Sequence, residues 1–223
     1  MVLLLLDFYS VMFLTGVLAL WNFFVIHYLS KWVYNFFKAH YIHVPAAYIG
    51  RKVVHILNGG ITTICTALFY EGYYWIVSIA ALLIALYIDY RRRTNIMYWF
   101  QVEGNRYEVH FAIMFGLILY LGVFLGDVWI GLIGMLFMSF GDAVTGLIRA
   151  FRQRRQVKSW DGTIAMFIVC SFIAFFKYGF YGVFMALISS LVERLPKVDD
   201  NVMVPLASGF MAYIYNLFPI LHV

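Results

Sequence analysis

Long apolar runs separated by short polar stretches dominate this chain of 223 residues. Several runs approach the roughly 20 apolar residues that a helix needs to cross a lipid bilayer. The runs are continuous and lack the alternation of membrane β-strands, so they predict membrane-spanning α-helices. Eight such segments are expected, at approximately 2–29, 53–70, 73–88, 108–126, 128–148, 163–178, 180–194 and 202–221. Only Lys177, Tyr178 and Gly179 separate the sixth segment from the seventh, so those two form either a tight hairpin or one interrupted segment.

The composition of the chain points to the same class of protein. Hydrophobic residues make up 64% of it and charged residues 12%, which excludes an ordinary soluble domain. No repeat or linker divides the sequence, so we expect one all-α, polytopic integral-membrane domain over residues 1–223, with the first span and its loop in 1–50. The first run has neither a basic leader nor a small-residue cleavage site, and we expect it to be retained. Cys65 and Cys170 lie inside apolar runs and are expected to be small buried hydrophobes.

Basic residues are concentrated in four loops, 30–52, 89–107, 149–162 and 193–201. If these loops share one side of the membrane, only Lys177 lies opposite, and the positive-inside rule makes the crowded side cytoplasmic. Both termini then face outward. The net charge of +5 is explained by this topology, and no nucleic-acid partner is expected. The basic residues of the crowded side are Lys31, Lys38, Arg51, Lys52, Arg91, Arg92, Arg93, Arg106, Arg149, Arg152, Arg154, Arg155, Lys158, Arg194 and Lys197.

Asp142 lies within the fifth apolar segment, where a carboxylate is costly and is therefore a candidate functional group. Helical spacing gives it a small and polar face, which allows a backbone or a phosphate group to approach closely. The alternative is a structural Asp142 that pairs with a lysine or arginine across the bundle. The other residues of this face are Gly134, Gly141, Thr145, Gly146 and Arg149.

The start of the second segment carries a polar stripe with two cations at its cytoplasmic end. Arg51, His55, Asn58, Gly59 and Thr62 recur at helical spacings of three and four, and Lys52 lies beside them. Such a stripe can hold an anionic ligand. In the alternative interpretation the two cations reach out to lipid head groups and His55 bonds a neighbouring helix.

Two further stretches bring polar groups to the same end of the membrane. Lys158 and Ser159, with Asp161 and Gly162, stand at the entry of the sixth segment, where free backbone amides favour phosphate; the preceding Arg152, Arg154 and Arg155 are expected to serve topology and lipid contact. Asp199, Asp200 and Asn201 precede the last segment. One of them is enough to cap a helix, and adjacent carboxylates near Asp142 would make an oxygen-rich site suited to Mg²⁺. Weaker candidates for the same site are Glu103, Asn105, Arg106 and Glu108.

Common catalytic motifs are absent from the sequence: it contains no GK[ST] phosphate loop, nucleophile elbow or zinc-protease spacing. A proton-coupled transporter remains an alternative. It is disfavoured because the polar groups gather at one end instead of spreading through the membrane depth.

The chain resembles the CTP-dependent polyprenol kinase family, which includes dolichol kinase and phytol kinase and is related to phosphatidate cytidylyltransferases. The resemblance runs from about residue 50 to the end and would make 51–223 a kinase-like core. It departs from the family at Asp161, where members commonly have a glutamate. The matching residues, in family order, are Arg51, Lys52, His55 and Gly59; Gly141, Asp142, Ala143 and Gly146; Lys158, Ser159, Gly162 and Thr163; Glu193; and Asp199, Asp200, Asn201 and Pro205.

The resemblance implies transfer of a phosphoryl group from CTP to the hydroxyl of a long isoprenoid alcohol of the dolichol or polyprenol type. Under this hypothesis Mg²⁺ is held by Asp142, Asp199 and Asp200. The basic residues Lys158, Arg51 and Lys52 bind the triphosphate. Asp161 or Asp200 is the expected base. The remaining nucleotide-binding candidates are His55, Gly59, Gly141, Gly146, Ser159, Gly162 and Asn201.

The alcohol is expected to enter sideways between helices from the surrounding membrane lipids. The site would face the cytoplasm, from the plasma membrane in a prokaryote or the endoplasmic reticulum in a eukaryote. The rival activities are a cytidylyltransferase that makes a CDP-lipid from a lipid phosphate, and a diacylglycerol kinase.

Overall fold

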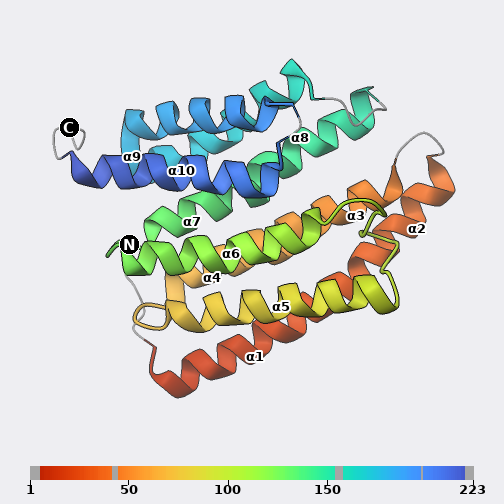
Figure 1. Ribbon diagram of the computed structural model, residues 1–223, viewed down its shortest axis with the longest axis horizontal. Coiled ribbons are helices and arrows are strands. Elements are labelled where there is room, and N and C mark those ends of the chain that lie inside the picture. Colours follow the sequence, from red (N-terminus) through yellow and green to blue (C-terminus); the bar gives the residue numbers. More distant parts are fainter. Residues whose placement is uncertain (1–5, 42–44, 154–157, 197, 219–223) are drawn as a thin grey trace.

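The computed structural model describes residues 6–41, 45–153, 158–196 and 198–218, and all regular secondary structure in these ranges is helical (Figure 1). This confirms the all-α prediction. The α-helices are α1 (Phe8–Phe24), α2 (Ser30–His40), α3 (Ala46–Val54), α4 (Ile61–Phe69), α5 (Tyr74–Thr94), α6 (Tyr107–Phe124), α7 (Trp129–Leu136), α8 (Asp142–Ile148), α9 (Trp160–Arg194) and α10 (Asp200–Leu217). Three π-helical segments join pairs of these helices end to end: η1 (Val25–Leu29), η2 (His55–Gly60) and η3 (Phe137–Gly141); a fourth, η4 (Arg149–Gln153), continues α8.

Six helical stretches within the described ranges are long and apolar enough to cross a membrane. The prediction of a polytopic helical membrane protein is therefore confirmed. The stretches are Phe8–His40, Ala46–Phe69, Tyr74–Thr94, Tyr107–Phe124, Trp129–Arg152 and Trp160–Arg194.

The last of these stretches, α9, folds back on itself at Gly179. The backbone of Gly179 has φ 55° and ψ −137°, a conformation that glycine adopts far more readily than other residues. The two arms meet again at their other ends, where the Arg194 guanidinium lies 3.4 Å from the centre of the Trp160 ring. Near the turn, a Cβ on Gly182 would lie 2.6 Å from the carbonyl oxygen of Ala174. The sixth and seventh predicted segments are thus a tight hairpin, and α10 covers residues 202–217 of the eighth, whose residues 219–221 lie outside the described ranges.

The surface of the bundle carries many large apolar side chains. Phe13, Leu83, Phe176 and Phe180 are each more than half exposed. Several polar and charged side chains, such as that of Asp142, are buried inside the bundle instead. This distribution fits a protein surrounded by lipid, because apolar side chains lose nothing by facing hydrocarbon.

The first helix is longer than the sequence predicted. Residues 30–40, expected in a loop, continue it as α2, which packs against α3. The expectation failed because α2 is amphipathic. Its polar residues, such as Lys31 and Lys38, interrupt the apolar run in the sequence, but they alternate with apolar residues such as the exposed Trp32 and Phe36 and do not end the helix.

Glycines let α7 and α10 pack closely and so fix the position of α10. A Cβ on Gly134 of α7 would lie 2.9 Å from the carbonyl oxygen of Pro205, and one on Gly209 would lie 3.0 Å from that of Ile130. Small residues at helix interfaces are typical of membrane proteins because they let two backbones approach. Here the approach fixes α10, whose first residue is Asp200, against the middle of the fifth segment.

The two ends of the bundle differ in charge. The C-terminal ends of α2, α5, η4 and α9 lie at one end of the bundle, where the basic residues gather, whereas Lys177 lies at the other end against the Trp129 ring (Figure 1). The grouping of basic loops therefore agrees with the predicted topology, while the cytoplasmic assignment stays a prediction. Arg154, Arg155 and Lys197, which entered that prediction, lie outside the described residues, as do residues 2–5 of the first expected segment.

Candidate functional site

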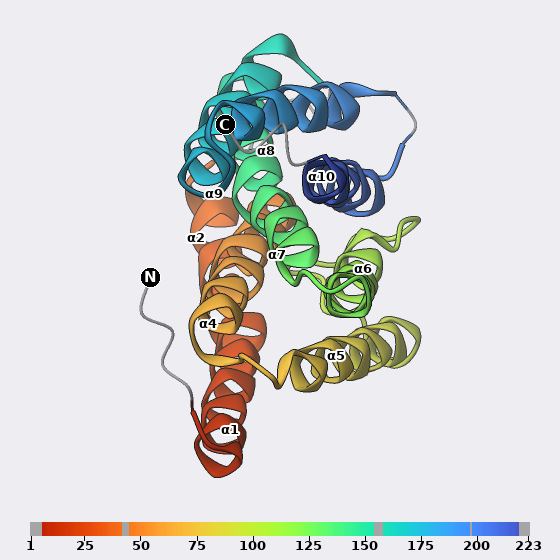
Figure 2. The same cartoon turned by 90° about the vertical axis from the view of Figure 1, so that its left-hand side faces the viewer.

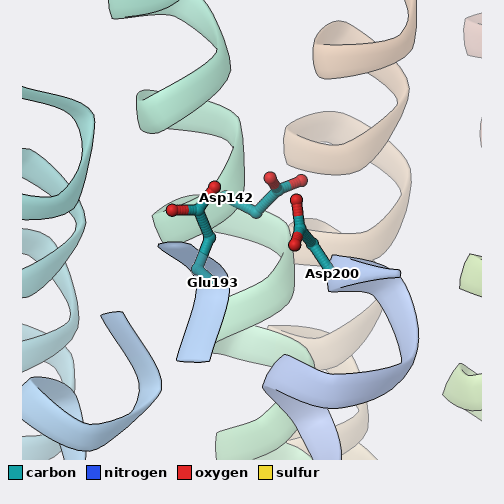
Figure 3. Close-up of side chains that lie close together, drawn as sticks. All are labelled: Asp142, Glu193 and Asp200. Carbon is teal, nitrogen blue, oxygen red and sulfur yellow. The ribbon is translucent and has the colours of Figure 1, made fainter. Parts of the chain in front are cut away.

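Three carboxylates from three helices converge at the basic end of the bundle. Asp142 begins α8, Glu193 lies in the last turn of α9 and Asp200 begins α10 (Figure 3). Each offers an oxygen within 4.8 Å of an oxygen of the other two. Asp142 and Glu193 are buried, and Asp200 is partly buried. Like charges this close repel one another unless cations or protons compensate them.

Each of the three carboxylates has its own cationic partner. The Lys52 ammonium lies 2.5 Å from Oδ2 of Asp142. A guanidinium nitrogen of Arg149 contacts Oε1 of Glu193. The Lys158 ammonium lies 2.5 Å from Oδ1 of Asp200. The site is therefore a buried, charge-compensated cluster, which we call the carboxylate cluster: Asp142, Glu193 and Asp200 with Lys52, Arg149 and Lys158.

One prediction about the polar stripe can now be decided. Lys52 is 3% exposed and Arg51 is 5% exposed, so the interpretation that they reach out to lipid head groups is wrong. Lys52 instead points inward to Asp142. The pairing of Asp142 with a basic residue across the bundle, offered as the structural alternative, is present. It does not make Asp142 purely structural, because two further carboxylates share its surroundings.

The π-helical segments place several of these side chains. His55 begins η2, Asp142 follows η3 directly, and Arg149 begins η4. A π-helical turn adds a residue to the helix and shifts the side chains that follow it, and such turns are frequent at functional sites. In this chain they turn the polar residues of two membrane-crossing stretches toward a common point.

Glycines make room for the cluster. A Cβ on Gly146 would overlap the Cε of Lys52, so the ammonium can reach Asp142 only past a glycine. A Cβ on Gly141 would lie 2.5 Å from Sγ of Cys170. These two residues, predicted to bind nucleotide, thus have a packing role that the structure shows directly.

His55 lies beside the cluster and is almost fully buried. Its Nδ1 is 3.3 Å from Oδ2 of Asp142, and its ring stacks on Phe111 with 4.3 Å between the ring centres. Neither ring nitrogen has a hydrogen bond of good geometry within the described part of the chain. The predicted candidate Gly59 lies one turn further on, where a Cβ would lie 2.5 Å from the Phe111 ring.

The predicted entry of the sixth segment is the N-terminus of α9. Lys158 donates hydrogen bonds to the Glu193 carbonyl at 2.5 Å and the Leu195 carbonyl at 2.8 Å in addition to Asp200. Ser159 caps the helix, accepting a hydrogen bond from the amide of Gly162 at 3.3 Å. Lys158 therefore ties both ends of the α9 hairpin to α10.

Asp161 points away from the cluster. Its carboxylate pairs with Arg152 at 3.4 Å, on a side where both side chains are exposed, at 38% and 72%. The two residues line a shallow groove of about 440 Å³ beside Ile164 and Ile168.

Asp199 is oriented differently from its neighbour Asp200. Its Oδ1 accepts hydrogen bonds from the backbone amide and the side-chain amide of Asn201, both at 3.0 Å, so it caps α10. Its Oδ2 contacts Nδ1 of His110. Among the three predicted metal ligands, the structure brings Asp142 and Asp200 together, and Glu193 takes the place beside them.

Arg51 also belongs to different surroundings. It lies 3.9 Å from the Glu108 carboxylate and donates to the Phe100 carbonyl and the Asn105 side chain, both at 3.4 Å. Glu108 is held more closely by Arg92, at 2.5 Å. Two of the weaker sequence candidates, Asn105 and Glu108, therefore form a second polar cluster with Arg51. Glu103 and Arg106 are exposed nearby.

The carboxylate cluster fits a hard divalent cation. Each carboxylate uses one oxygen for its cation, and Oε2 of Glu193 is buried without a hydrogen-bond partner among the described residues. Carboxylate oxygens are the donors that Mg²⁺ prefers, completed by water or phosphate oxygens. Burial and the Asp142 charge raise the pKa of Asp200 to about 7, which a bound cation would oppose.

Sequence reasoning gave no role to Glu193, although it noted the residue as part of the resemblance. The only local signal is a carboxylate in the last turn of an apolar segment, which is equally typical of an exposed helix end. In the structure Glu193 is 0% exposed. The hairpin turn at Gly179, which brings it back beside Lys158, is what makes it a site residue.

Comparisons with known proteins give two distant relatives. An uncharacterised protein of Methanocaldococcus jannaschii is 31% identical over 116 residues, which cover 49% of this chain and 59% of that protein. A phytol kinase of Synechocystis is 28% identical over 191 residues, which cover 77% of this chain and 81% of that protein. No protein-family model matches the chain, and no solved structure matches it.

Proposed function

We propose that this chain is a membrane-embedded lipid-alcohol kinase that transfers the terminal phosphate of CTP to a long isoprenoid alcohol, with Mg²⁺ as its cofactor. The observation that carries the proposal is the carboxylate cluster, in which three acidic and three basic side chains meet at one end of the bundle. The distant similarity to a phytol kinase supports a lipid-alcohol kinase in general. CTP as donor and an acceptor of the dolichol or polyprenol type belong to the proposal alone.

Phosphoryl transfer needs mainly positioning and the neutralisation of charge. Lys52, Arg149 and Lys158 supply cations beside the place where the triphosphate would lie, and Arg51 lies further off. Asp142, Glu193 and Asp200 would hold Mg²⁺, which when bound would neutralise part of the phosphate charge. Asp199 lies within reach as an additional ligand only if its contact with His110 is given up.

In the transfer step the alcohol oxygen forms a bond to the terminal phosphorus as its O–H bond breaks. The bond from that phosphorus to the bridging oxygen breaks in the same step and leaves CDP. We assign acceptance of the alcohol proton to Asp200, because among the three carboxylates of the cluster it is the one that is partly exposed. Asp161, the other sequence candidate, is occupied by Arg152 on an exposed side.

The test is a product assay with purified protein and two forms of labelled CTP. If the chain is a kinase, label in the γ-phosphate moves to the lipid and label in the α-phosphate stays in CDP. If it is a cytidylyltransferase, label in the α-phosphate moves to the lipid and pyrophosphate is released. The acceptors to compare are phytol, geranylgeraniol, a long polyprenol, diacylglycerol and phosphatidate, which separate the isoprenoid kinase from the diacylglycerol kinase and the cytidylyltransferase.

Lys158→Ala and Asp142→Asn test the site within the same assay. We expect both variants to insert in the membrane and to lose turnover. If both retain the wild-type rate, the site assignment is wrong, and if the wild type turns over no nucleotide with any acceptor, the transporter alternative gains ground. Accessibility of a cysteine introduced at Ser159, in intact cells and in permeabilised cells, tests the proposed cytoplasmic side.

A further inference from the structure

A narrow cavity of about 110 Å³ runs between α1, the Ala46–Phe69 stretch, α5 and α6. Figure 2 looks along the helices, with α1 and α4 on one side of this region and α5 and α6 on the other. The cavity extends from His55 to Tyr70 along one helical stretch, which is about 22 Å at 1.5 Å per residue. It is therefore long and thin. We call it the slot.

The walls of the slot are mainly apolar, as Leu18, Val77, Ile84 and Phe115 illustrate. Its sides approach the surface between α1 and α5, because Ala19 lines it and is exposed, and Ala80 lines it and is partly exposed. A slot of this kind, open toward the membrane, admits a flexible apolar chain from the lipid.

The end of the slot at His55 has buried polar atoms without hydrogen-bond partners in the described part of the chain. They are Nε2 of His55 and Oδ1 of Asn58; Oε2 of Glu108 also lacks a hydrogen bond but lies 3.9 Å from Arg51. The three side chains are at most 5% exposed. A buried polar atom without a partner costs free energy, so several together at the end of one cavity indicate a polar ligand group that satisfies them.

His55 connects this end of the slot with the carboxylate cluster. It lines the slot, and its Nδ1 lies 3.3 Å from Oδ2 of Asp142. A hydroxyl bound at His55 and Asn58 is thus about one imidazole ring away from Asp142, which the proposed function assigns to Mg²⁺.

We propose that the slot binds the hydroxyl end of the acceptor, an isoprenoid alcohol, with its hydroxyl at His55 and Asn58, the first part of its chain in the slot, and the rest leaving between α1 and α5 past Ala19 and Ala80. The inference rests on the proposed lipid-alcohol kinase function and gives the acceptor a place in it. It also gives His55 a different role from the nucleotide contact that the sequence predicted: here His55 orients the alcohol.

The experiment is photocrosslinking with geranylgeraniol that carries a diazirine at the end remote from the hydroxyl, without nucleotide. We expect peptides of α1 and α5 around Ala19 and Ala80 to be labelled, and unlabelled geranylgeraniol to compete. The matching hydrocarbon without a hydroxyl should compete at least tenfold less well. Equal competition by the hydrocarbon overturns the assignment of the polar end, and labelling confined to the groove at Ile164 and Ile168 overturns the slot itself.

Ala80→Phe narrows the slot, and Leu83→Phe is its matched control because Leu83 is 61% exposed on the same helix. We expect Ala80→Phe to raise the KM for the alcohol about tenfold, to leave the KM for the nucleotide unchanged and to reduce crosslinking. Leu83→Phe should change none of them. Equal effects of the two substitutions contradict the proposal.

The two proposals can fail separately. Crosslinking in the slot without phosphorylation of any alcohol leaves the binding site standing and removes the kinase function. Phosphorylation of geranylgeraniol with crosslinking elsewhere removes the slot and leaves the kinase function standing. Asn58→Leu provides a second variant for the polar end, since it keeps the size of the side chain and removes the carbonyl oxygen that lacks a partner.

Discussion

Asp142 and Glu108 are two carboxylates buried to the same degree, at 3% and 4% exposure, but they have different neighbours. Asp142 has one lysine at 2.5 Å and two further carboxylates within reach. Glu108 has one arginine at 2.5 Å and a second at 3.9 Å. Two further carboxylates with their own cations lie around the first, whereas the two ion-pair partners of the second are both arginines.

The difference separates a carboxylate of a candidate functional site from one that holds helices together. Burial is costly for either carboxylate, so burial alone does not indicate which one has a chemical role. Glu108 joins α6 to α5 and α3 and leaves no negative charge in excess. Asp142 lies where three carboxylates converge, an arrangement that favours binding a cation and has no advantage for packing.

The largest expected effect is that of Asp142→Asn. We expect turnover to fall by about a thousandfold, because one carboxylate that positions charge at the reacting phosphate is lost. The measurement is the rate of lipid phosphate formation from labelled CTP at saturating substrates. Elution as a monodisperse peak in detergent serves as the control for folding. A variant that keeps more than a tenth of the wild-type rate would contradict a catalytic Asp142.

Glu193→Gln tests the residue that the sequence did not assign. We expect the Mg²⁺ concentration for half-maximal activity to rise about tenfold, because one of three cation-binding oxygens becomes an amide oxygen. Asp199→Asn is the matched control, since asparagine also caps helices and Asp199 faces His110. It should shift the Mg²⁺ requirement less than twofold. The reverse ranking would restore Asp199 as the ligand in place of Glu193.

Glu108→Gln is expected to affect stability more than chemistry. Removing the charge leaves the buried Arg51 and the partly buried Arg92 without their carboxylate, at a cost of about 3 kcal/mol. The midpoint of thermal unfolding in detergent should fall by about 10 °C. Glu103→Gln, an exposed neighbour, should leave it unchanged. Should Glu108→Gln instead abolish turnover at a temperature where the protein remains folded, the contrast with Asp142 would be lost.

The smallest effect is expected from Asp161→Asn. Its ion pair with Arg152 is exposed, and exposed pairs contribute about 0–1 kcal/mol. Turnover should stay within about twofold of the wild-type rate, and the midpoint of thermal unfolding should stay within about 2 °C of the wild-type value. A loss of turnover comparable with that of Asp142→Asn would return Asp161 to the role of base and remove Asp200 from it.

Much of the fold could be predicted from apolar runs alone, because a helix that crosses lipid must be continuously apolar. The end of the first helix could not be predicted in this way. Lys31 and Lys38 indicate a loop in the sequence, whereas in the structure the helix continues through them. The site was only partly predictable for a related reason. Asp142 is unusual within its own segment, whereas Glu193 becomes unusual only through burial, and burial depends on the hairpin turn and on the packing of α10.

The orientation of adjacent residues was also beyond the sequence. Asp199 and Asp200 are chemically alike, and only the start of α10 decides that the first caps the helix while the second faces Lys158. Arg51 and Lys52 diverge in the same way, to Glu108 and to Asp142. For Arg51 and Lys52 the choice follows from the rotation of about 100° between successive helical residues, and for Asp199 and Asp200 from the extended backbone of the N-cap residue.

The fold-back at Gly179 has a consequence for biosynthesis. Lys52 and Asp142 belong to segments that leave the ribosome before the hairpin, so their ion pair can form while the rest of the chain is still being made. Glu193 and Asp200 arrive with the last two segments, together with the turn that carries them back. Two of the three carboxylates of the cluster therefore enter the membrane last, and a translation product that stops at Gly179 would retain the early pair without a cation site.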